Sequence, residues 1–429
     1  MRDIANYALD AMVKAGADKA SCKVTSGRKD EFNVEANKFS LLRTLFDDEL
    51  SLKIIKGGRK GTLTVNKLDK DSIDKAVEEC LTLATSSTPD EAEDIAPKTE
   101  NKSFDRSIGG MDMGKLFSRS KELLETVNDK YPKIALDMQT EFNNQKIAYI
   151  NTNGAEFQDN VEYYSAQTIF TAKEGEESSS FNYYWSAMDS LNLPFIDMGM
   201  QRMLLDEAVR SIKTRMVEEK FVGKIIVTPA CNDMIWDTIM RYLIGRDVLI
   251  QDTSRWKDAL GTVVADKKLT MRTSPLHPSM IAQERFTNDG FVAKDTDFIR
   301  DGVLTNFALD LYGANKTGKP MAGNTSFYNI EVAAGDTPLG DMIKGVSKGL
   351  LLNRFSGAQP GVSGDVSGVA KNSFLIENGQ VTDAVSETMI SFNIVDILKN
   401  IPAISKERCT EGSTILPWCC FDGVTISGK

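Results

Sequence analysis

The side chains best suited to hydrolytic chemistry are scarce in this sequence. It contains one histidine, His277, which lies between Pro275 and Pro278. A zinc hydrolase ordinarily needs at least two imidazoles, or a compensating set of thiolates and carboxylates at fixed spacing. No H-E-x-x-H, H-x-H or C-x-x-C pattern occurs. We therefore expect no metal centre held by this chain alone.

The six cysteines are expected to be structural thiols. They are Cys22, Cys80, Cys231, Cys409, Cys419 and Cys420. Cys419 and Cys420 are adjacent in an apolar, strand-like run, so their side chains should point to opposite faces. Because the cysteines lack paired spacing and the chain start does not resemble an export signal, we expect reduced thiols and a cytoplasmic protein.

A hydrolase without a metal would need His277 as its base, because imidazole titrates near neutral pH. No G-x-S-x-G occurs, and no pattern places a nucleophile beside this histidine. His277 is therefore interpreted as a surface-loop residue. The acidic pairs Asp47-Asp48 and Asp295/Asp297 are interpreted as solvated faces or turn caps. A stand-alone hydrolase that uses His277, or a metal held by carboxylates, is kept as an alternative.

The segment 313–319, GANKTGK, fits the G-x-x-x-x-G-K spacing of a phosphate-binding loop. Pro320 replaces the hydroxyl residue that would bind magnesium, and the residues after it lack a helical pattern. We interpret the match as a coincidence and the segment as a glycine-rich connection. Because Gly313, Gly318 and Gly323 permit close approach of the backbone, they are candidates to line a cleft.

The segment Gly223–Arg246 predicts a strand, a tight turn and a helix, and the chain is organised around it. Ile225–Val227 are apolar and β-branched, and Thr228-Pro229 ends this run. Asn232 and Asp233 can cap the turn that follows. The residues that recur at helical spacing are Met234, Ile235, Ile239, Met240 and Leu243.

The composition describes an ordinary soluble globular protein: 429 residues, 41% hydrophobic and 26% charged. The length exceeds a typical single domain. The net charge of −10 and the pI near 5.0 disfavour a nucleic-acid-binding protein. No apolar run approaches the ~20 residues that span a bilayer. The amphipathic first helix is not a signal peptide.

We expect an α+β fold in three parts. Residues 1–98 should form an N-terminal domain of helices and antiparallel sheet, and residues 103–217 a mixed middle segment. Residues 218–429 should form a β-rich C-terminal domain of hairpins with a few helices. Residues 30–40 are expected to form one strand, and residues 86–102 a surface linker. The turn signals are Gly57-Gly58, Asn153-Gly154, Asp301-Gly302 and Asn378-Gly379.

Several stretches, in the correct order, resemble the TldD/PmbA family, in which PmbA is also called TldE and was once described as a modulator of DNA gyrase. The first helix is followed by Gly16-Ala17-Asp18, and the segment Gly223–Arg246 has the family's strand, turn and helix. Residues 361–401 and the closing DGVTISGK resemble the PmbA/TldE branch. The resemblance covers residues 5–428.

The resemblance also locates a missing motif. In the TldD branch the helix carries H-E-x-x-x-H, which supplies two zinc-binding histidines and a glutamate base. Aligned from Pro229, these positions fall on Asp237, Thr238 and Tyr242, none of which is histidine or glutamate. The resemblance therefore implies a chain without catalytic residues or zinc of its own.

Three further positions follow from the resemblance. Cys409 lies in the region where the catalytic branch places a cysteine ligand, but it has no histidine partners on the helix. Asp365 and Ser367 lie within the resembling stretch 361–401. Together with the three glycines, Asp365 and Ser367 are candidates for a cleft or an interface.

The resemblance implies a heterodimer with a TldD-like zinc subunit that carries the zinc. The pair would cleave unfolded or extended peptides, with the peptide held as an added strand in an internal cleft. This chain would shape the cleft and the interface. When isolated it is expected to form a homodimer, because a surface built for a related subunit can pair with itself. A protein-binding regulator without a peptidase role, as the gyrase label suggests, is a third interpretation.

Overall fold

A computed structural model describes residues 1–231, 233–326, 328–358 and 360–428. The predicted capping residue Asn232 lies outside these ranges. The N-terminal half contains α1 (Arg2–Lys14), β1 (Lys19–Glu35), β2 (Lys38–Lys56), β3 (Arg59–Val65), α2 (Lys70–Ser86), β4 (Lys102–Arg106), α3 (Met113–Lys130), β5 (Ile134–Asn151), β6 (Glu156–Glu174), β7 (Glu177–Ser178), β8 (Asn182–Met188), a 3-10 turn η1 (Phe195–Asp197) and α4 (Gln201–Arg210).

The N-terminal half is built on one long, curved sheet. Its strand order is β3-β2-β1-β5-β6-β4, and β7 and β8 also pair with β6. β1 pairs with β5 from Ser21 opposite Asn151 to Val34 opposite Met138. The sheet therefore runs continuously across residues 98–103, where we placed a boundary from the sequence. That division, and the one at 217, stays a prediction.

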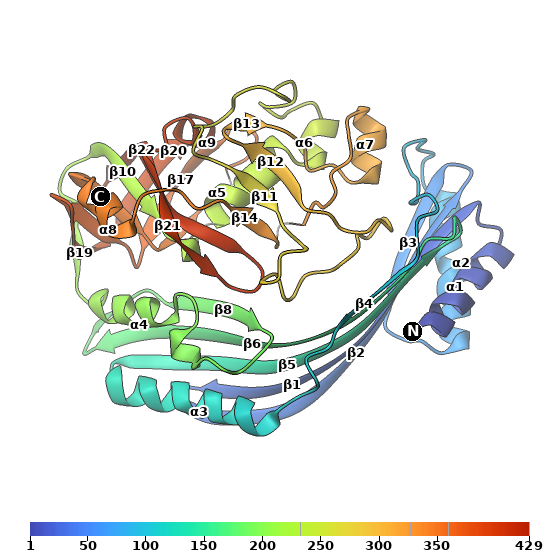
Figure 1. Ribbon diagram of the computed structural model, residues 1–429, viewed down its shortest axis with the longest axis horizontal. Coiled ribbons are helices and arrows are strands. Elements are labelled where there is room, and N and C mark those ends of the chain that lie inside the picture. Colours follow the sequence, from blue (N-terminus) through green and yellow to red (C-terminus); the bar gives the residue numbers. More distant parts are fainter. Residues whose placement is uncertain (232, 327, 359, 429) are drawn as a thin grey trace.

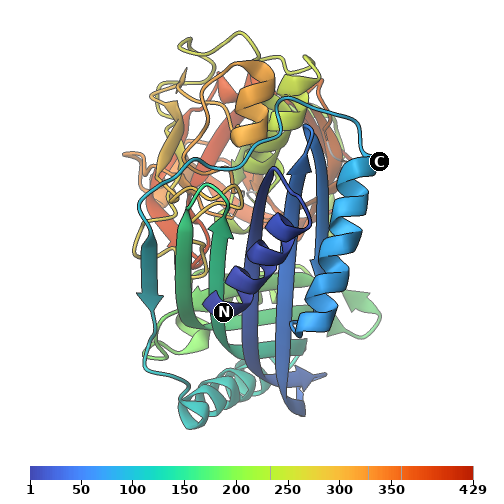
Figure 2. The same ribbon diagram turned by 90° about the vertical axis from the view of Figure 1, so that its right-hand side faces the viewer.

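Helices cover the two ends of this sheet separately. At one end α1 and α2 pack on the strands through Met12, Ile73 and Cys80, which are buried (Figure 2). At the other end α3 packs through Leu116 and Val127. Both sets of apolar residues recur at helical spacing, so burial of one face of each helix stabilises this arrangement.

Glycine is required where α2 crosses β3. A Cβ at Gly61 would lie 2.1 Å from the carbonyl oxygen of Cys80, which is closer than any side chain can approach.

The predicted turns at Gly57-Gly58 and Asn153-Gly154 are confirmed between β2 and β3 and between β5 and β6. The prediction of one strand over residues 30–40 is wrong. The chain reverses at Ala36 and Asn37, which have positive φ angles of 44° and 64°. The Asn37 side chain donates to the carbonyl of Ile134 and accepts from the amide of Leu136. Contacts with β5 thus stabilise a turn that lacks a glycine signature.

The C-terminal half forms a second, 14-stranded sheet. Its elements begin with β9 (Thr214–Met216), β10 (Phe221–Val227), η2 (Pro229–Cys231), α5 (Asp233–Thr238), the π-helical turn η3 (Ile239–Leu243), α6 (Arg246–Ile250), β11 (Met271–Thr273), β12 (Thr296–Arg300), β13 (Val303–Leu304), α7 (Leu311–Thr317) and β14 (Ile330–Val332). They continue with α8 (Leu339–Lys344), β15 (Lys348–Leu352), β16 (Arg354–Gly357), β17 (Asp365–Lys371), β18 (Phe374–Glu377), β19 (Gln380–Ser386), β20 (Thr388–Asn393), α9 (Ile394–Leu398), β21 (Ala403–Thr410) and β22 (Ile415–Ser427).

The centre of this sheet is β10, which pairs in parallel with β15 and antiparallel with β22. The turns predicted at Asp301-Gly302 and Asn378-Gly379 are confirmed between β12 and β13 and between β18 and β19. Helices and two sheets together confirm the predicted α+β class. No helix in the described ranges is both long and apolar enough to cross a bilayer.

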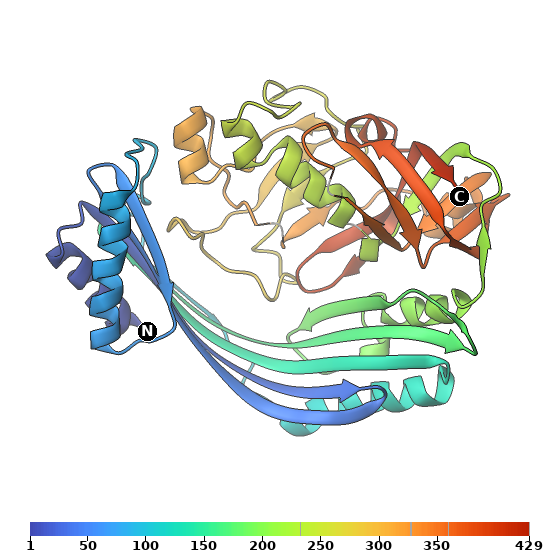
Figure 3. The same cartoon turned by 180° about the vertical axis from the view of Figure 1, so that it is seen from behind.

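The curved sheet wraps around the C-terminal half. β8 is its edge nearest to that half and β2 the edge farthest away (Figures 1 and 3). The segment 86–102, which we interpreted as a surface linker, packs against the C-terminal half. The Ala96 amide donates to the carbonyl of Asp289, and Asp90 forms an ion pair of 2.8 Å with Lys316. This segment fixes the upturned end of the sheet beside the C-terminal half.

Candidate functional site

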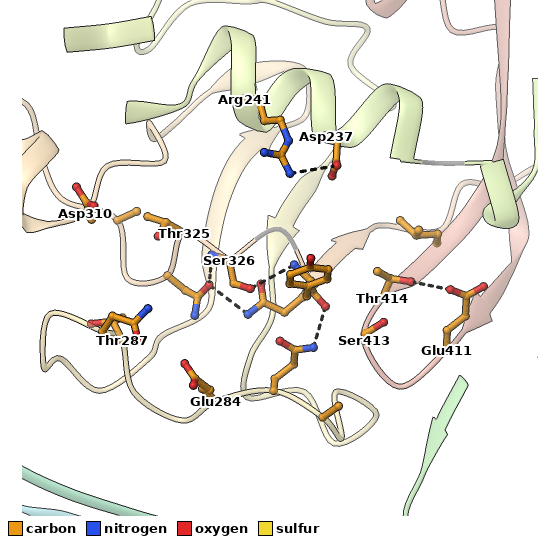
Figure 4. A pocket seen from close by; sticks show the side chains of 18 of the residues that line it. Asp237, Arg241, Glu284, Thr287, Asp310, Thr325, Ser326, Glu411, Ser413 and Thr414 are labelled. Carbon is orange, nitrogen blue, oxygen red and sulfur yellow. Dashed lines mark hydrogen bonds and ion pairs between the residues drawn. The ribbon is translucent and has the colours of Figure 1, made fainter. Parts of the chain in front are cut away.

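A cavity of about 860 Å³ lies between the β8 edge and the C-terminal half (Figure 4). Three elements distant in sequence form its walls: β8, the helix that follows β10, and the hairpin loop between β21 and β22. The residues that these elements contribute are Tyr183, Tyr184, Trp185, Asp237, Arg241, Glu411, Ser413 and Thr414. Residues from the loops 282–291, 321–326 and 328–329 also line the cavity, as do Pro229, Ala230, Asp310 and Leu416.

The predicted strand, turn and helix of the segment 223–246 are confirmed as β10, η2 and α5. Ile235, Ile239 and Leu243 are fully buried, as the helical spacing predicted. The π-helical turn η3 was not predicted. It closes with a bond from the Ile244 amide to the Ile239 carbonyl, 3.0 Å and five residues back. Such a turn lets residues five positions apart lie on one helix face. The two histidines of H-E-x-x-x-H are five positions apart.

The three positions of the missing motif have different surroundings. Asp237 lines the cavity, and its Oδ2 lies 3.7 Å from Nη2 of Arg241. The Thr238 hydroxyl is buried and donates to the Met234 carbonyl at 2.6 Å, so its hydrogen is used within the helix. Tyr242 is half-buried and lies outside the cavity lining.

The donor set does not suit a zinc ion. Among the described residues, no three His, Cys, Asp or Glu side chains lie close enough together to hold a metal. Burial and the neighbouring Glu411 raise the pKa of the Cys409 thiol to about 12. The Tyr184 hydroxyl lies 3.7 Å from the Sγ atom of Cys409. Cys409 is therefore a protonated, packed thiol at neutral pH and not a thiolate ligand.

The other cysteines have a similar environment. All six lie in the described ranges, are buried and form no disulfide. Burial raises the pKa of each of Cys22, Cys80, Cys419 and Cys420. This agrees with their interpretation as structural thiols.

The acidic groups of the cavity are held by partners. Lys23 on β1 forms an ion pair with Glu284, and Arg246 pairs with Asp310 at 2.6 Å. Burial raises the pKa of Asp289, whose Oδ2 accepts from the Leu311 amide. The cavity is thus polar, with its charges fixed in place.

The β8 edge is the feature of the cavity that the sequence analysis missed. β8 pairs with β6 on one side, from Phe170 opposite Asn182 to Tyr164 opposite Met188. On its other side, the Ala187 amide donates a hydrogen bond to the carbonyl of Glu411. On this strand Tyr183 is 45% exposed and Trp185 is half-buried, and both line the cavity. The run of three aromatic residues at 183–185 was the available signal in the sequence.

The remaining predicted site residues lie elsewhere. His277 is half-buried outside the cavity lining, and its Nδ1 accepts from the Ser279 amide at 3.1 Å. Gly313, Gly318, Gly323, Asp365 and Ser367 do not line this cavity. Gly323 instead lines a separate pocket beside Arg272 and Asp297. Whether they form an interface stays a prediction.

The glycine-rich segment 313–319 is not a simple connection. Residues 313–317 form most of the short helix α7, which Asp310 caps by accepting from the Gly313 amide. Gly318 ends α7 at a φ of 66°. Asp365 on β17 accepts from Asn393 at 2.9 Å.

Comparison with known proteins supports the family resemblance. Residues 222–428 match the PmbA/TldA metallopeptidase C-terminal domain. The metalloprotease PmbA homolog of Haemophilus influenzae is 22% identical, over 100% of this chain and 96% of that protein. The metalloprotease PmbA of Escherichia coli O157:H7 is 29% identical over 37% of each chain.

Two solved structures share the fold. A putative modulator of DNA gyrase from Bacteroides thetaiotaomicron has a TM-score of 0.88 at 22% identity, covering 100% of this chain and 99% of that one. TldE from Thermococcus kodakarensis has a TM-score of 0.80 at 18% identity, with both chains fully covered.

Proposed function

This chain belongs to the PmbA/TldD metallopeptidase family, in its PmbA/TldE-like branch, and from this premise we propose that it is the non-catalytic subunit of a two-subunit zinc peptidase. A TldD-like partner would carry the zinc and the base. This chain would shape the cleft that binds the peptide and the interface with the partner. A cytoplasmic location is part of the same proposal.

The observation that carries the proposal is which residues the helix beside the cavity has at the positions of the zinc motif. The family's strand, turn and helix are present, but an aspartate in an ion pair, a threonine bonded within the helix and a half-buried tyrosine occupy the motif positions 237, 238 and 242. Neither threonine nor tyrosine offers the neutral imidazole that a hydrolytic zinc site uses. The helix therefore supports a wall of the cleft and not a reaction centre.

The proposed ligand is an extended peptide. An extended peptide can add to the edge of a sheet through main-chain hydrogen bonds. Pockets for its alternate side chains then give sequence specificity. β8 lies on the cavity wall, and its residues Tyr183, Tyr184 and Trp185 line the cavity in which such a peptide would be bound. A folded protein has few unpaired extended segments, so this mode of binding would favour unfolded substrates.

The alternatives find less support. A hydrolase that uses His277 would need this side chain beside a bound substrate, and His277 lies outside the cavity lining. A carboxylate-held metal would need acidic groups that converge, and the described residues contain no such cluster. A regulator without a peptidase role has in its favour the description of one structural neighbour as a putative modulator of DNA gyrase, and no contact in this structure.

The test measures zinc and cleavage for the purified chain. Zinc is measured by plasma mass spectrometry, and cleavage with an unstructured fluorogenic peptide, first for the chain alone and then with the H-E-x-x-x-H subunit from the same genome. We expect substoichiometric zinc and no cleavage alone, and cleavage with the partner. Cleavage by the chain alone that survives chelation and is lost in His277→Ala would overturn the proposal.

A further inference from the structure

A second, smaller pocket lies beside the cavity, and we call it the side pocket. Its volume is about 310 Å³. Tyr183, Ala230 and Asp237 line both the side pocket and the cavity, so the two spaces lie next to each other. Arg354, the first residue of β16, lines the side pocket and is half-buried.

Aromatic rings at the start of β8 hold the guanidinium group of Arg354. Its Cζ atom lies 3.5 Å from the ring centroid of Phe181 and 5.5 Å from that of Tyr183. Its Nη1 atom donates to the carbonyl of Phe181. Stacking on an aromatic ring fixes the plane of a guanidinium and leaves its edges available for hydrogen bonds.

The positive charge of Arg354 has no carboxylate partner in the part of the chain that the structure describes. Its one hydrogen bond there is the bond to Phe181, so the edge formed by Nε and Nη2 is unused. Burial lowers the pKa of this guanidinium, yet an arginine keeps its charge at neutral pH. A half-buried cation without a counter-ion is unfavourable, and a bound anion would relieve that cost.

The other charges around the two spaces favour the side pocket for an anion. Asp237, the one acidic residue among its described lining residues, forms an ion pair with Arg241 (Figure 4). In the cavity, carboxylates outnumber cations among the lining residues. An anion would therefore be bound less well in the cavity than beside Arg354.

We propose that Arg354 and the side pocket form a subsite for a carboxylate group of the bound peptide, either its C-terminal carboxylate or an acidic side chain. This inference rests on the proposed function, because the group belongs to the peptide that the cavity would bind. A carboxylate can accept two parallel N–H bonds from one edge of a guanidinium, which makes the contact both strong and directional. The subsite would fix the position of the peptide beside Tyr183.

Arg354 also has a structural role, which the test has to separate from ligand binding. The Phe181 carbonyl accepts from Arg354 and, at 3.1 Å, from Nδ2 of Asn372, so both residues attach the start of β8 to the C-terminal half. A variant that only loosened this attachment would weaken the binding of every peptide to the same extent. Loss of a carboxylate contact would weaken only the peptides that carry the carboxylate.

The test compares three labelled, unstructured peptides by fluorescence anisotropy with the full-length chain. One has a free C-terminal carboxylate, the second is amidated, and the third is amidated and ends in glutamate; none contains another acidic residue. The peptides are measured with the chain alone and with the zinc subunit added after removal of its metal, so that none is cleaved. We expect at least one of the two carboxylate-bearing peptides to bind about tenfold more tightly than the amide, and which one does so identifies the source of the carboxylate.

Variants at position 354 assign this preference to the guanidinium. Arg354→Gln removes the charge but keeps an N–H donor for the Phe181 carbonyl, and it should bind the three peptides about equally. Arg354→Lys keeps the charge but loses the planar fork, so its preference should be smaller than that of the parent chain. Arg300→Gln, at a 63% exposed side chain outside both spaces, is the matched control and should keep the full preference. Urea unfolding checks that each variant is folded.

The outcomes separate this inference from the proposed function. Equal binding of the three peptides by the parent chain would overturn the carboxylate subsite and leave the peptide cavity in place. A preference that survives unchanged in Arg354→Gln, or in Arg354→Lys if the glutamine variant does not fold, would overturn the role of Arg354. No binding of any peptide, with or without the zinc subunit, would contradict the proposed function and the subsite together.

Discussion

Asp237 and Arg241 form an ion pair one helical turn apart on the wall of the cavity, with 3.7 Å between Oδ2 and Nη2. In the alignment from Pro229, Asp237 falls on the first histidine of H-E-x-x-x-H. The ion pair therefore lies at the position where that motif has a zinc ligand. It supports the proposed non-catalytic role of this helix.

This ion pair should contribute little to stability and nothing to bond cleavage. The two side chains are 32% and 49% exposed, and such helix pairs contribute about 0.3–0.5 kcal/mol. In Asp237→Asn we expect the free energy of unfolding, measured in urea, to fall by about 0.5 kcal/mol or less. The turnover number of the assembled enzyme should change far less than the roughly 100-fold that loss of an acid–base group causes. A 100-fold loss of turnover would make Asp237 a reacting group.

The aromatic wall of β8 should determine the affinity for peptide. Trp185→Ala removes a large contact surface from the cavity wall, and we expect about tenfold weaker binding of an unstructured peptide. Fluorescence anisotropy with a labelled peptide measures this. Leu193→Ala is the matched control, because Leu193 is 61% exposed and lies outside the cavity lining. Equal affinities of the two variants would argue against binding at β8.

Glu207 on α4 should make stability depend on pH. Its carboxyl group is buried and accepts from the Asn353 amide at 2.7 Å, and burial raises its pKa to about 8. The unfolded chain releases this proton near pH 4.5, whereas the folded chain keeps it until about pH 8. Stability from this group is therefore fully present below pH 4.5 and is lost as the pH rises to 8.

Glu207→Gln keeps the group neutral at every pH, so the free energy of unfolding should no longer fall between pH 5 and pH 8 for this reason. As the pH rises over that range, the free energy of unfolding of the variant should gain more than about 1 kcal/mol relative to that of the parent chain. Urea unfolding at several pH values measures it. Glu79→Gln, at an exposed position, is the control. Parallel pH curves for Glu207→Gln and the parent chain would contradict the prediction.

Local sequence signals predicted the local structure well. Gly57-Gly58 and Asn378-Gly379 identified hairpins because a two-residue turn with positive φ favours glycine and asparagine. The spacing of Ile235, Ile239 and Leu243 identified the buried face of the central helix. These features depend on neighbours in sequence, so the sequence reveals them.

Features that depend on distant contacts were missed. The turn at Ala36-Asn37 is held by contacts with residues 134–136. The packing of the segment 86–102 depends on Asp289 and Lys316, about 200 residues away. The place of residues 183–185 on the cavity wall depends on the pairing of β8 with β6 and on the packing of the C-terminal half. Residues 182–188 contain no proline or lysine of the kind that often marks an edge strand.

A titration of the two subunits tests the central claim most directly. The zinc subunit is held at a fixed concentration, this chain is added in steps, and the initial rate of peptide cleavage and the zinc bound to each subunit are measured. We predict that the rate rises to a plateau at one equivalent of this chain, while the zinc stays with the partner. A rate that does not respond to this chain, or zinc bound stoichiometrically to this chain, would contradict the account.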